Sequence, residues 1–567
     1  MPTEHDPNTG DLRARITGVA RDVFGWESLR PGQAEAVEAV VSGSDALAVM
    51  STGYGKSALY QIAGHLLEGP TVVVSPLISL QADQVRHLQE RTGTDDVVAL
   101  NSAQSGRAAE AAWEAIASGE AEFLFLAPEQ LARDEVIDEL AALGVGLFVV
   151  DEAHCVSAWG HDFRPDYLRL GAVIERLGGP RILALTATGS APVREEIVRR
   201  LGLRDPKLFV RGFDRPNIEL EVVRHESEAV KERAVREQVL DAVKPGLVYV
   251  STRADTERLA EELEQDGMRA AAYHGGLRAA ERRGVQDRFH ADELDVVVAT
   301  SAFGMGIDKP NVRFVVHADI TDSIDSYYQE VGRAGRDGEP ARATLHYRQE
   351  DLALRRFFAG GRTAPSTVEA VLGALAPRGR RRRMPLADLT EASGLSRRTA
   401  ANVVNLLIEA QLADEDAKGV SLARKVSTAE AVDAVREVAD QRRRIEESRL
   451  AMMRGYAETR GCRRQYLLEY FGDDLTEPCG RCDTCASGSA GEREREREER
   501  ERELQEREAQ AQADAFREGE RVRHEAWGEG EIVSVEADRL TAFFEVEGYR
   551  VLSLEVIDAR PGLLTPV

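Results

Sequence analysis

The sequence predicts an α/β protein in which two consecutive α/β lobes precede smaller helical, cysteine-rich and β-rich segments. Short runs of Val, Ile and Leu alternate with helix-like stretches from about residue 45 to 350, and the turn-rich FDRPN at 213–217 divides them into two series. Four cysteines then gather within residues 462–485. An alternating, strand-like pattern occupies the last 50 or so residues.

The apolar runs carry the prediction of two lobes. The first series is DALAVM, TVVVSP, VVALN, EFLFLAP, LFVVDEA and RILALTAT, and the second is GLVYVST, AAAYHGG, DVVVAT, VRFVVHAD and ATLHY. Continuous apolar strands separated by helices are typical of parallel sheets that are covered on both faces. We therefore expect lobes at 1–210 and 211–350 with a cleft between them. The alternative is one large doubly wound domain.

Four further segments follow the lobes. Residues 351–430 contain the helical patterns STVEAVLGALA, PLADLTEASG and SRRTAANVVNLLIEAQLAD before the strand-like GVSLARKV, which indicates a winged-helix-like insertion or a plain helical spacer. Residues 431–488 indicate a helix pair that leads into the cysteines. The Arg/Glu run at 489–515 is either a solvated helix or a disordered linker. Residues 516–567 alternate around Gly and Asp turns, which predicts a small β-barrel.

Composition bounds the function only loosely. With 567 residues, of which 43% are hydrophobic, the chain has ample material for several buried cores. The N-terminus lacks a signal-peptide pattern, and no apolar run is long enough to cross a membrane, so we expect a cytoplasmic protein without a membrane partner. The net charge of −25 does not exclude nucleic acid, because much of the acidity lies in GEREREREERERELQERE and electrostatic footprints are local.

The segment VMSTGYGKS predicts a phosphate-binding loop between the strand at 45–50 and the helical SALYQIAGHLL. Glycines let backbone N–H groups approach phosphates, and a helix N-terminus adds a positive dipole. Lys56 should neutralise the β- and γ-phosphates of ATP, and Ser57 should ligate Mg²⁺. Met50 stands where the first glycine is usual, but the strand–loop–helix context supports the prediction. The expected nucleotide contacts here are Thr52, Gly53, Gly55, Lys56 and Ser57.

Two carboxylates follow an apolar strand in FVVDEAH, about a hundred residues after the loop. Asp151 is suited to hold Mg²⁺, and Glu152 to orient and polarise the attacking water. The alternative is a helix N-cap.

The cysteine spacing predicts a metal site. Cys462, Cys479, Cys482 and Cys485 follow the pattern C-x16-C-x2-C-x2-C, and thiolates in C-x2-C spacing can hold one tetrahedral Zn²⁺. Four protein ligands leave no open position, so the zinc should be structural. An iron–sulfur cluster is the alternative. Cys155 stands apart from these four and should simply be buried.

Long motifs give the chain a family resemblance. FGWESLRPGQ, MSTGYGKS, VVSPLISLQADQV, DEAHCVSAWGHDFRPDY, LTATGSA, YHGGL, VATSAFGMGIDKPNVRFVVH and YYQEVGRAGRDG occur in this order, and CRRQYLLEYFG…EPCGRCDTC follows. Together they resemble the RecQ family of superfamily 2 helicases over roughly residues 20–350 and again at the cysteines. The resemblance implies two tandem RecA-like P-loop lobes and a 3′→5′ DNA helicase, driven by DNA-stimulated ATP hydrolysis, that unwinds forked or tailed duplexes in repair and recombination.

The resemblance also implies roles for residues at the nucleotide. Gln33 can read the adenine edge through its amide, with Trp26 or Arg30 against the base face, although Trp26 could equally be ordinary core. Arg333 and Arg336 on the second lobe are the fingers that reach across the cleft, because phosphoryl transfer needs cations at the γ-phosphate. Nucleotide-side or coupling positions are matched by Gly304, Asp308 and Gln329.

Predicted DNA contacts lie on two loops. In RecQ proteins the aromatic-rich loop CVSAWGHDFRP couples DNA binding to hydrolysis, and aromatic faces stack on bases without regard to sequence. Its candidate residues are Trp159, Phe163 and Arg164, with a surface cluster for lobe packing as the alternative. Ser79 in SPLISL should contact the DNA backbone. Gln81-Ala82 replaces a more basic pair usual in the family, which should weaken this grip.

Two departures from the family arrangement stand out. The winged-helix-like stretch precedes the cysteines instead of following them. The final 50 or so residues, with RVRHEAWGEGEIVSVE, resemble the small SH3/Tudor-like barrel that ends UvrD/PcrA-type repair helicases. That barrel type implies a protein partner such as RNA polymerase or repair factors.

Three hypotheses for the function remain. The first is a DNA helicase acting on single-stranded and forked DNA, associated with the nucleoid in the cytoplasm. The second is an ATP-driven RNA or nucleoprotein remodeller, against which the aromatic-rich loop and the zinc module argue. The third is a DNA-binding platform with a weak motor. The intact residues of the predicted ATP site argue against it, namely Lys56, Asp151, Glu152 and Arg336.

Overall fold

The computed structural model describes residues 7–51, 53–76, 81, 84–86, 88–90, 96–101, 104, 106–157, 165–303, 309–353, 363–376, 382–416, 419–473, 475–497, 499–500, 502, 516–536, 539–545, 547–560 and 562–567. The chain divides into two compact units, Met1–Asp483 and Thr484–Val567. Within the described parts, no helix has both the length and the apolar character needed to cross a membrane.

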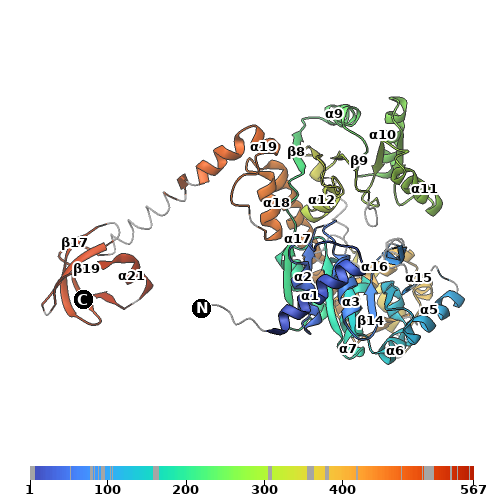
Figure 1. Ribbon diagram of the computed structural model, residues 1–567, viewed down its shortest axis with the longest axis horizontal. Helices are drawn as coiled ribbons and strands as arrows, with labels where there is room; N and C mark the ends of the chain where they lie inside the picture. Colours follow the sequence, from blue (N-terminus) through green and yellow to red (C-terminus); the bar gives the residue numbers. More distant parts are fainter. Residues whose placement is uncertain are drawn as a thin grey trace. The chain divides into compact units, whose positions relative to one another are not determined.

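The first lobe is a seven-stranded sheet in the order β3-β4-β2-β5-β6-β1-β7, with all neighbours parallel (Figure 1). Its inner strands are wholly buried runs of aliphatic and aromatic residues, as expected for a sheet covered on both faces. The strands are β1 (Ala46–Met50), β2 (Thr71–Val74), β3 (Val97–Leu100), β4 (Phe123–Leu126), β5 (Leu147–Val150), β6 (Arg181–Thr186) and β7 (Lys207–Arg211).

Helices on this sheet supply the rest of the first core. Helices α1, α2 and α3 pack together over β1, where Ile16, Val37 and Ile62 are fully buried. The described helices of the lobe are α1 (Pro7–Asp22), α2 (Gln33–Val41), α3 (Ser57–Leu66), α5 (Gly106–Ser118), α6 (Asp134–Leu143), α7 (Leu170–Arg176) and α8 (Ala191–Leu201).

The second lobe is a separate six-stranded parallel sheet in the order β10-β11-β9-β12-β13-β8 (Figure 1). Its strands are β8 (Ile218–Arg224), β9 (Gly246–Tyr249), β10 (Ala270–Tyr273), β11 (Val296–Ala299), β12 (Phe314–His317) and β13 (Ala341–Tyr347). The helices are α9 (Glu228–Asp241), α10 (Arg253–Gln265), α11 (Ala279–His290) and α12 (Ile324–Val331). Two separate sheets confirm the predicted pair of lobes and exclude one doubly wound domain.

The strands β7 and β8 were not among the predicted strands. Both lie at a sheet edge, and their burial is interrupted by exposed residues, such as Leu208 in β7 and Glu219 in β8. A strand that is covered incompletely lacks the continuous apolar run by which the other strands were recognised.

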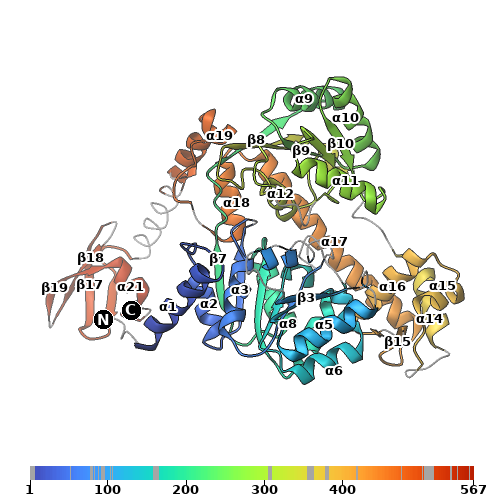
Figure 2. The ribbon, with the colours of Figure 1, turned by 45° about the vertical axis from the view of Figure 1, so that its right-hand side comes forward.

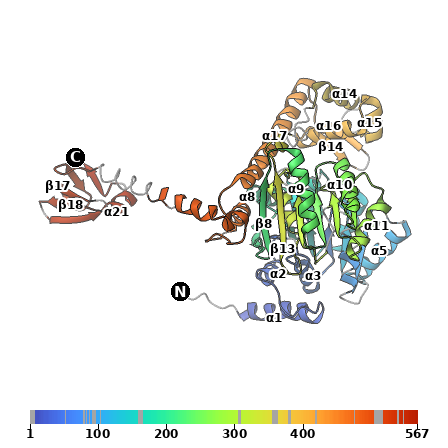
Figure 3. The ribbon, with the colours of Figure 1, turned by 90° about the horizontal axis from the view of Figure 1, so that it is seen from above.

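Three helices and a hairpin follow the second lobe in the predicted order. Helices α14 (Pro365–Leu375), α15 (Leu386–Ser393) and α16 (Arg397–Glu409) precede the antiparallel pair β14 (Ala413–Asp416) and β15 (Gly419–Leu422). They share one hydrophobic core with the start of α17 (Thr428–Glu458). Figure 3 shows these helices as a group around that end of α17.

The 31-residue helix α17 connects this group to the cysteine segment (Figure 2). Its first half packs on α14 and α16, and its second half on α12 of the second lobe and on α18 (Arg463–Phe471). A salt bridge of 3.2 Å between Arg169 and Glu415 joins the hairpin to the first lobe. One continuous helix therefore reaches from the insertion to the second lobe.

The second unit ends in a five-stranded antiparallel sheet in the order β19-β18-β17-β16-β20. The elements are β16 (Arg521–His524), β17 (Gly528–Val535), β18 (Arg539–Phe544), β19 (Gly548–Ser553), α21 (Leu554–Ala559) and β20 (Leu564–Pro566). The predicted small β-barrel is described as this one five-stranded sheet, and no pairing between its edge strands β19 and β20 is found among the described residues. Helix α21 lies between these two strands in sequence and buries Leu554 and Ile557 in the core of the sheet.

The charged run before this sheet begins as a helix. Residues 489–497 are helical, with ion pairs of 3.6 Å between Arg493 and Glu496 and 2.6 Å between Arg497 and Glu494. The solvated-helix alternative therefore holds for these residues.

Candidate active site and metal centre

A glycine-bearing loop joins β1 to α3 in the first lobe. Gly53 and Gly55 have φ of 79° and 89°, a left-handed conformation that favours glycine. A β-carbon on Gly55 would also lie 2.8 Å from Nε2 of Gln33. The loop delivers Lys56 and Ser57 to the N-terminus of α3, as predicted. The ammonium nitrogen of Lys56 donates to the carbonyl of Met50 at 3.0 Å.

The two predicted carboxylates lie at the end of β5, which is two strands away from β1 in the sheet. Asp151 accepts hydrogen bonds from Nε2 of Gln84 at 3.1 Å and from the backbone nitrogen of Glu152 at 3.0 Å. Glu152 has a positive φ of 48°, which is uncommon for a residue other than glycine. The backbone therefore turns sharply at Glu152, so the consecutive carboxylates of Asp151 and Glu152 are oriented differently.

Burial and the two carboxylates of the first lobe act on the pKa of Lys56. Burial lowers the pKa of Lys56, whereas the negative charges of Glu152 and Asp151 raise it. Burial raises the pKa of the Asp151 carboxyl, and the charge of Lys56 opposes that shift. The lysine and the two carboxylates therefore share one electrostatic environment, as a site for a cation and a polyphosphate requires.

Arg336 reaches this environment from the second lobe. A β-carbon on Gly53 would lie 3.7 Å from Cγ of Arg336, and the positive charge of Arg336 lowers the pKa of Lys56. Two cations are thus held near one loop, an arrangement that an anionic ligand between them would stabilise.

Arg333 and Gln329 also belong to the second lobe. Arg333 is buried, and its charge opposes the rise that burial gives the pKa of the Tyr249 hydroxyl at the end of β9. Gln329 is half-buried on α12. Of the two predicted fingers, the structure brings Arg336 to the phosphate loop.

The predicted adenine-side residues contact the loop itself. Nε2 of Gln33 donates to the carbonyls of Tyr54 and Gly55 at 3.1 and 3.0 Å, and Nη1 of Arg30 donates to the carbonyl of Gly53. Trp26 stacks on Phe24 with ring centroids 4.7 Å apart, at the edge of the core. Gln33 and Arg30 therefore brace the phosphate loop, and Trp26 has the packing of the core alternative.

Several predicted site residues lie outside the described residues: Thr52, Ser79, Trp159, Phe163, Arg164, Gly304 and Asp308. The segments that flank the aromatic-rich loop are nevertheless well defined. On one side, Ser157 donates to Glu196 at 2.6 Å; on the other, the hydroxyl of Tyr167 donates to the carbonyl of Asp151 at 3.1 Å. Both ends of the loop are therefore anchored, one of them directly to the residue that carries a candidate magnesium ligand.

Sequence reasoning missed two contacts of the carboxylate strand. Gln84 orients Asp151, and Nδ1 of His154 lies 3.0 Å from the hydroxyl of Thr186 at the end of β6. The same Thr186 hydroxyl donates to the carbonyl of Thr188 at 2.6 Å. Gln84 belongs to the motif VVSPLISLQADQV, and Thr186 to the motif LTATGSA. Their partners Asp151 and His154 lie 67 and 32 positions away in the sequence, which a linear pattern does not reveal.

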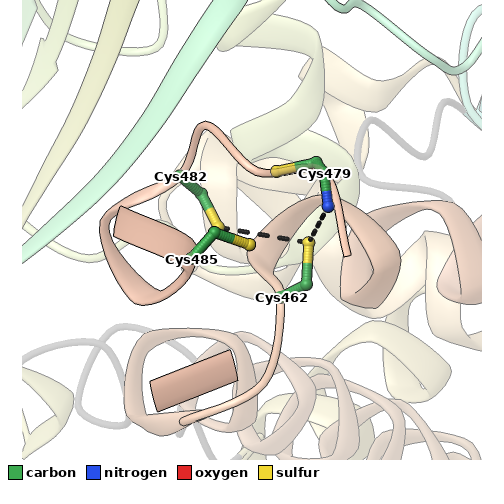
Figure 4. A group of neighbouring side chains, drawn as sticks. All are labelled: Cys462, Cys479, Cys482 and Cys485. Carbon is green, nitrogen blue, oxygen red and sulfur yellow. Dashed lines mark hydrogen bonds between the residues drawn. The ribbon is translucent and has the colours of Figure 1, made fainter. Parts of the chain in front are cut away.

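The four clustered cysteines lie together around α18 and α19 (Asp483–Ala486). One sulfur from each of Cys462, Cys479, Cys482 and Cys485 lies within 4.8 Å of the others. Figure 4 shows the four side chains gathered at one place, with the backbone nitrogen of Cys479 donating to Sγ of Cys462 at 3.2 Å. Cys155 is buried in the first lobe, as predicted.

The cysteine cluster fits a zinc ion chemically. Neighbouring thiols and burial raise the pKa of Cys462, so a proton is held there unless a cation stabilises the thiolate. Four thiolates at this spacing are the donor set of a closed tetrahedral zinc site. The hydroxyl of Ser57 and the carboxylate of Asp151 are in turn oxygen donors of the kind that Mg²⁺ prefers.

Three family models match the chain in sequence order. A DEAD/DEAH box helicase model matches residues 30–196, and a helicase conserved C-terminal domain matches residues 231–338. A RecQ zinc-binding model matches residues 420–486. These matches cover both lobes and the cysteine cluster.

Full-length relatives extend the similarity. The chain is 36% identical over 467 residues to the ATP-dependent DNA helicase RecQ of Haemophilus influenzae, covering 82% of this chain and 63% of that protein. It is 34% identical over 465 residues to the probable ATP-dependent DNA helicase RecS of Bacillus subtilis, covering 82% of this chain and 90% of that protein. The chain thus spans less than two thirds of the Haemophilus relative but nearly all of the Bacillus one.

Among solved structures, the helicase MrfA bound to DNA superposes with a TM-score of 0.51 at 15% identity. The superposition covers 76% of this chain and 64% of that structure. At this level of identity the likeness concerns the fold alone.

Proposed function

Because the chain belongs to the RecQ family of helicases, we propose that it is an ATP-dependent DNA helicase that moves 3′→5′ along one strand and separates forked or tailed duplexes. One observation carries the proposal: Lys56 and the carboxylates of the first lobe meet Arg336 of the second lobe at one phosphate loop. A site built from two lobes can change when the lobes move, which is what a nucleotide-driven motor needs.

In the proposed mechanism each group has one task. The glycine loop and the N-terminus of α3 hold the phosphates, and Lys56 and Arg336 stabilise the negative charge that develops on them. Glu152 orients and polarises the attacking water, and Asp151 with Ser57 would hold the metal. Magnesium, when bound with ATP, supplies additional charge neutralisation at the phosphates. Loss of the phosphate then removes the anion that keeps Arg336 and Lys56 together.

Coupling to DNA is proposed to run through the aromatic-rich loop. The hydroxyl of Tyr167, after the loop, donates to the backbone carbonyl of Asp151. A DNA strand that moves the loop would therefore act on the backbone of the residue that bears the proposed metal-binding carboxylate. Base stacking on Trp159 and Phe163 would supply binding without sequence preference, at roughly 1–3 kcal/mol per base. We place this activity at the nucleoid in the cytoplasm.

Comparison of polynucleotide cofactors distinguishes the competing hypotheses. We expect single-stranded DNA to stimulate ATP hydrolysis by the full chain, and RNA of the same sequence to stimulate it much less. Stronger stimulation by RNA would favour the RNA remodeller, and no hydrolysis with either polymer would favour the binding platform. Replacement of Trp159 by Ala should leave basal hydrolysis intact and reduce the stimulation; unchanged stimulation would rule out the coupling role.

We further propose that the C-terminal sheet binds a protein partner, such as RNA polymerase, by adding a strand at β19. Phe543, Tyr549 and Val551 lie on one face and are 40%, 68% and 62% exposed, and the rings of Phe543 and Tyr549 are 5.0 Å apart. In the described sheet β19 pairs with β18 alone, so its other edge offers backbone donors and acceptors. An apolar patch beside such an edge favours an extended peptide.

Purified RNA polymerase tests this partner directly. The full chain should bind RNA polymerase in bio-layer interferometry. The double variant with Val551→Ser and Tyr549→Ser should bind it at least tenfold more weakly. Equal binding by the variant, or no binding by either protein, contradicts the proposal.

A further inference from the structure

Helix α18 contacts the segment that joins the two lobes. The stretch 213–222 runs from the end of the first sheet into β8, and its residues line one small apolar cavity together with Leu467 and Leu468 of α18. Val331 at the end of α12 and Gly332 at the start of the loop that carries Arg336 line the same cavity. We call residues 332–336 the arginine loop. We call residues 431–488, which contain the four clustered cysteines, the cysteine module, and residues 213–222 the joining segment. The cysteine module, the joining segment and the arginine loop are thus neighbours.

Arg215 holds the arginine loop by its backbone. Its guanidinium donates to the carbonyls of Gly332 at 3.3 Å, Ala334 at 2.7 Å and Gly335 at 2.9 Å. The carbonyls of Ala334 and Gly335 lie between Arg333 and Arg336, and that of Gly332 lies directly before Arg333. A single planar side chain therefore fixes the turn from which Arg336 projects. Arginine suits this task because its donors have a rigid, fork-like geometry.

Asn217 supports the same turn. Its amide nitrogen donates to the carbonyl of Gly335 at 2.7 Å and to that of Glu339 at 2.9 Å. A β-carbon on Gly335, whose φ is +55°, would lie 2.4 Å from that nitrogen. The close approach of Asn217 therefore requires glycine in the loop.

Arg464 of α18 holds Arg215 in turn. The buried guanidinium of Arg464 donates to the carbonyl of Arg215 at 3.2 Å and to that of Ile218 at 2.8 Å. It also lies 3.4 Å from a carboxylate oxygen of Asp214. Arg464 thus fixes the backbone at Arg215 and at Ile218, and contacts the side chain of the residue before Arg215.

The rest of the cysteine module grips the joining segment as well. Arg481 donates to the carbonyl of Pro216 at 3.0 Å, and the backbone nitrogen of Val222 donates to Asp483 at 3.3 Å. Asp483 is itself held by Arg463 through two hydrogen bonds of 2.6 and 2.9 Å. Cys462 is the N-cap residue of α18, and Cys482 directly precedes Asp483. Two of the four clustered cysteines are therefore next in sequence to elements that make these contacts.

The far end of α18 contacts both lobes and the segment between them. The ring of Phe471 stacks on Phe213 at 4.6 Å and packs against Tyr328 of α12 at 4.8 Å. Arg194 of the first lobe donates to the carbonyls of Phe471 and Gly189 at 2.8 and 3.0 Å. The position of α18 is therefore defined against both lobes.

We propose that Arg464 and Arg215 are positioning residues for ATP hydrolysis: α18 holds Arg464, Arg464 holds the backbone of Arg215, and Arg215 holds the loop that aims Arg336 at the phosphate loop. The cysteine module thereby sets the position of the Arg336 side chain, in addition to any role that this module has in binding DNA. This inference rests on the proposed ATPase function. Small misplacement of a catalytic group costs up to roughly 100-fold in rate, so the effect should appear in kcat.

The test uses the full chain and conservative variants. Arg215→Lys and Arg464→Lys keep the charge but cannot reproduce the paired, planar hydrogen bonds. Arg454→Lys is the matched control, because Arg454 belongs to the same module but is half-exposed in an ion pair with Glu458. Steady-state kcat and KM for ATP are measured with saturating single-stranded DNA, alongside nucleotide affinity, zinc content and melting temperature.

We expect kcat to fall about 10- to 100-fold in Arg215→Lys and Arg464→Lys, with KM and nucleotide affinity within about twofold of the wild type. Arg454→Lys should behave as the wild type, and all variants should retain zinc. In an Arg336→Ala background, either substitution should produce no further fall, because both act through Arg336.

Three results would overturn the inference. They are an unchanged kcat in both variants, a fall of the same factor in the Arg336→Ala background, or a fall fully accounted for by lost zinc or lost nucleotide affinity. Inactivity of the wild-type chain with DNA would instead refute the proposed function, so the two failures are distinguishable.

Hydrogen exchange gives a readout that does not depend on catalysis. The amides of Ala334 and Gly335 are bonded to the carbonyls of Val331 and Val312. In Arg464→Lys we expect faster exchange in peptides covering 213–218 and 332–336, and unchanged exchange in those covering α3. Unchanged exchange in the arginine loop would contradict the linkage from α18.

Discussion

Lys56 lies between partners of opposite kinds. Its ammonium group donates to the carbonyl of Met50 at 3.0 Å. The negative charges of Glu152 and Asp151 raise the pKa of Lys56, and the positive charge of Arg336 lowers it. A polyphosphate bound at the loop would satisfy both cations at once, because opposite charges attract strongly where water is excluded. The residue is therefore suited to stabilise charge on phosphate.

Replacement of Lys56 by Ala should reduce kcat for DNA-stimulated ATP hydrolysis by at least about 100-fold, the scale of losing one preorganised charge-stabilising group. DNA affinity and melting temperature should stay close to the wild type. Lys207→Ala is the matched control, since Lys207 is exposed on β7 of the same lobe. Hydrolysis by the Lys56 variant at more than half of the wild-type rate would contradict the assignment.

The histidine pair at the edge of the second lobe makes stability depend on pH. Nε2 of His225 lies 2.8 Å from Nδ1 of His346, and Nε2 of His346 lies 2.6 Å from Oε1 of Gln238. Burial lowers the pKa of His346 to about 3, with the charge of His225 acting in the same direction. An unfolded histidine titrates near pH 6.5, so the unfolded chain binds more protons than the folded chain between these values.

Stability should therefore fall as the pH is lowered from about 6.5 towards 3. We expect the melting temperature of the full chain to drop between pH 7 and pH 5, and His346→Gln to reduce that drop. His290→Gln is the control, because His290 is exposed on α11. An identical pH profile in the His346 variant and the wild type would show that the pair is not responsible.

At the residue scale, contiguous motifs were predictable and long-range contacts were not. The phosphate loop, the carboxylates at 151–152 and the four cysteines each lie on one short stretch whose chemistry is evident from spacing. Arg215 and Arg464 were missed because each acts on residues more than 110 positions away. The sequence indicated that Gln33 was important, but its contacts with the carbonyls of Tyr54 and Gly55 required the folded loop.

At the scale of elements, α18 is a short helix with an unusual number of tasks. Cys462 stands at its N-cap, Arg464 holds the joining segment, and Phe471 at its end packs between Phe213 and Tyr328. A helix of nine residues is too short to be stable alone, so its packing and the metal centre must hold it. Metal ligation and lobe geometry are therefore expected to be coupled.

The cysteine centre should bind one zinc ion per chain, measurable by elemental analysis of the purified protein. Cys482→Ser should abolish the bound zinc and lower the melting temperature, because binding free energy at a structural site is folding free energy. Cys155→Ser is the control, since Cys155 is buried outside the cluster and should leave the zinc content unchanged. Full zinc content in Cys482→Ser, or iron in place of zinc, would contradict the assignment.

Interior strands were predictable because their apolar runs are continuous, whereas the edge strands β7 and β8 were not. Closure of the C-terminal sheet was not predictable for a related reason. Alternation along β16 to β19 predicted strands correctly, but closure depends on which edges meet, and β20 is only three residues long. Local patterns thus fix the elements, while sheet closure depends on contacts between distant segments.

At the scale of the whole molecule, the chain combines the proposed motor with a small β-rich unit. The described residues of the proposed nucleotide site lie within Met1–Asp483, and the C-terminal sheet has its own hydrophobic core. Separate cores indicate that one part can be removed without exposing the core of the other. The insertion 363–428 differs in this respect, because its core includes residues of α17 that continue to the second lobe.

Removal of residues 513–567 should leave ATP hydrolysis and DNA unwinding within about twofold of the full chain, while abolishing any binding that depends on β19. The control is the full chain prepared in parallel, with matched zinc content. Loss of unwinding in the truncated protein would mean that the C-terminal sheet is part of the motor.

Strand displacement on tailed duplexes tests the central claim most directly. The full chain is incubated with ATP and a duplex carrying either a 3′ or a 5′ single-stranded DNA tail, with Lys56→Ala and a non-hydrolysable ATP analogue as controls. We predict that the wild type separates the 3′-tailed duplex, leaves the 5′-tailed duplex paired, and separates neither in the controls. Failure to separate any DNA duplex while hydrolysing ATP, or separation that persists in Lys56→Ala, would contradict the account.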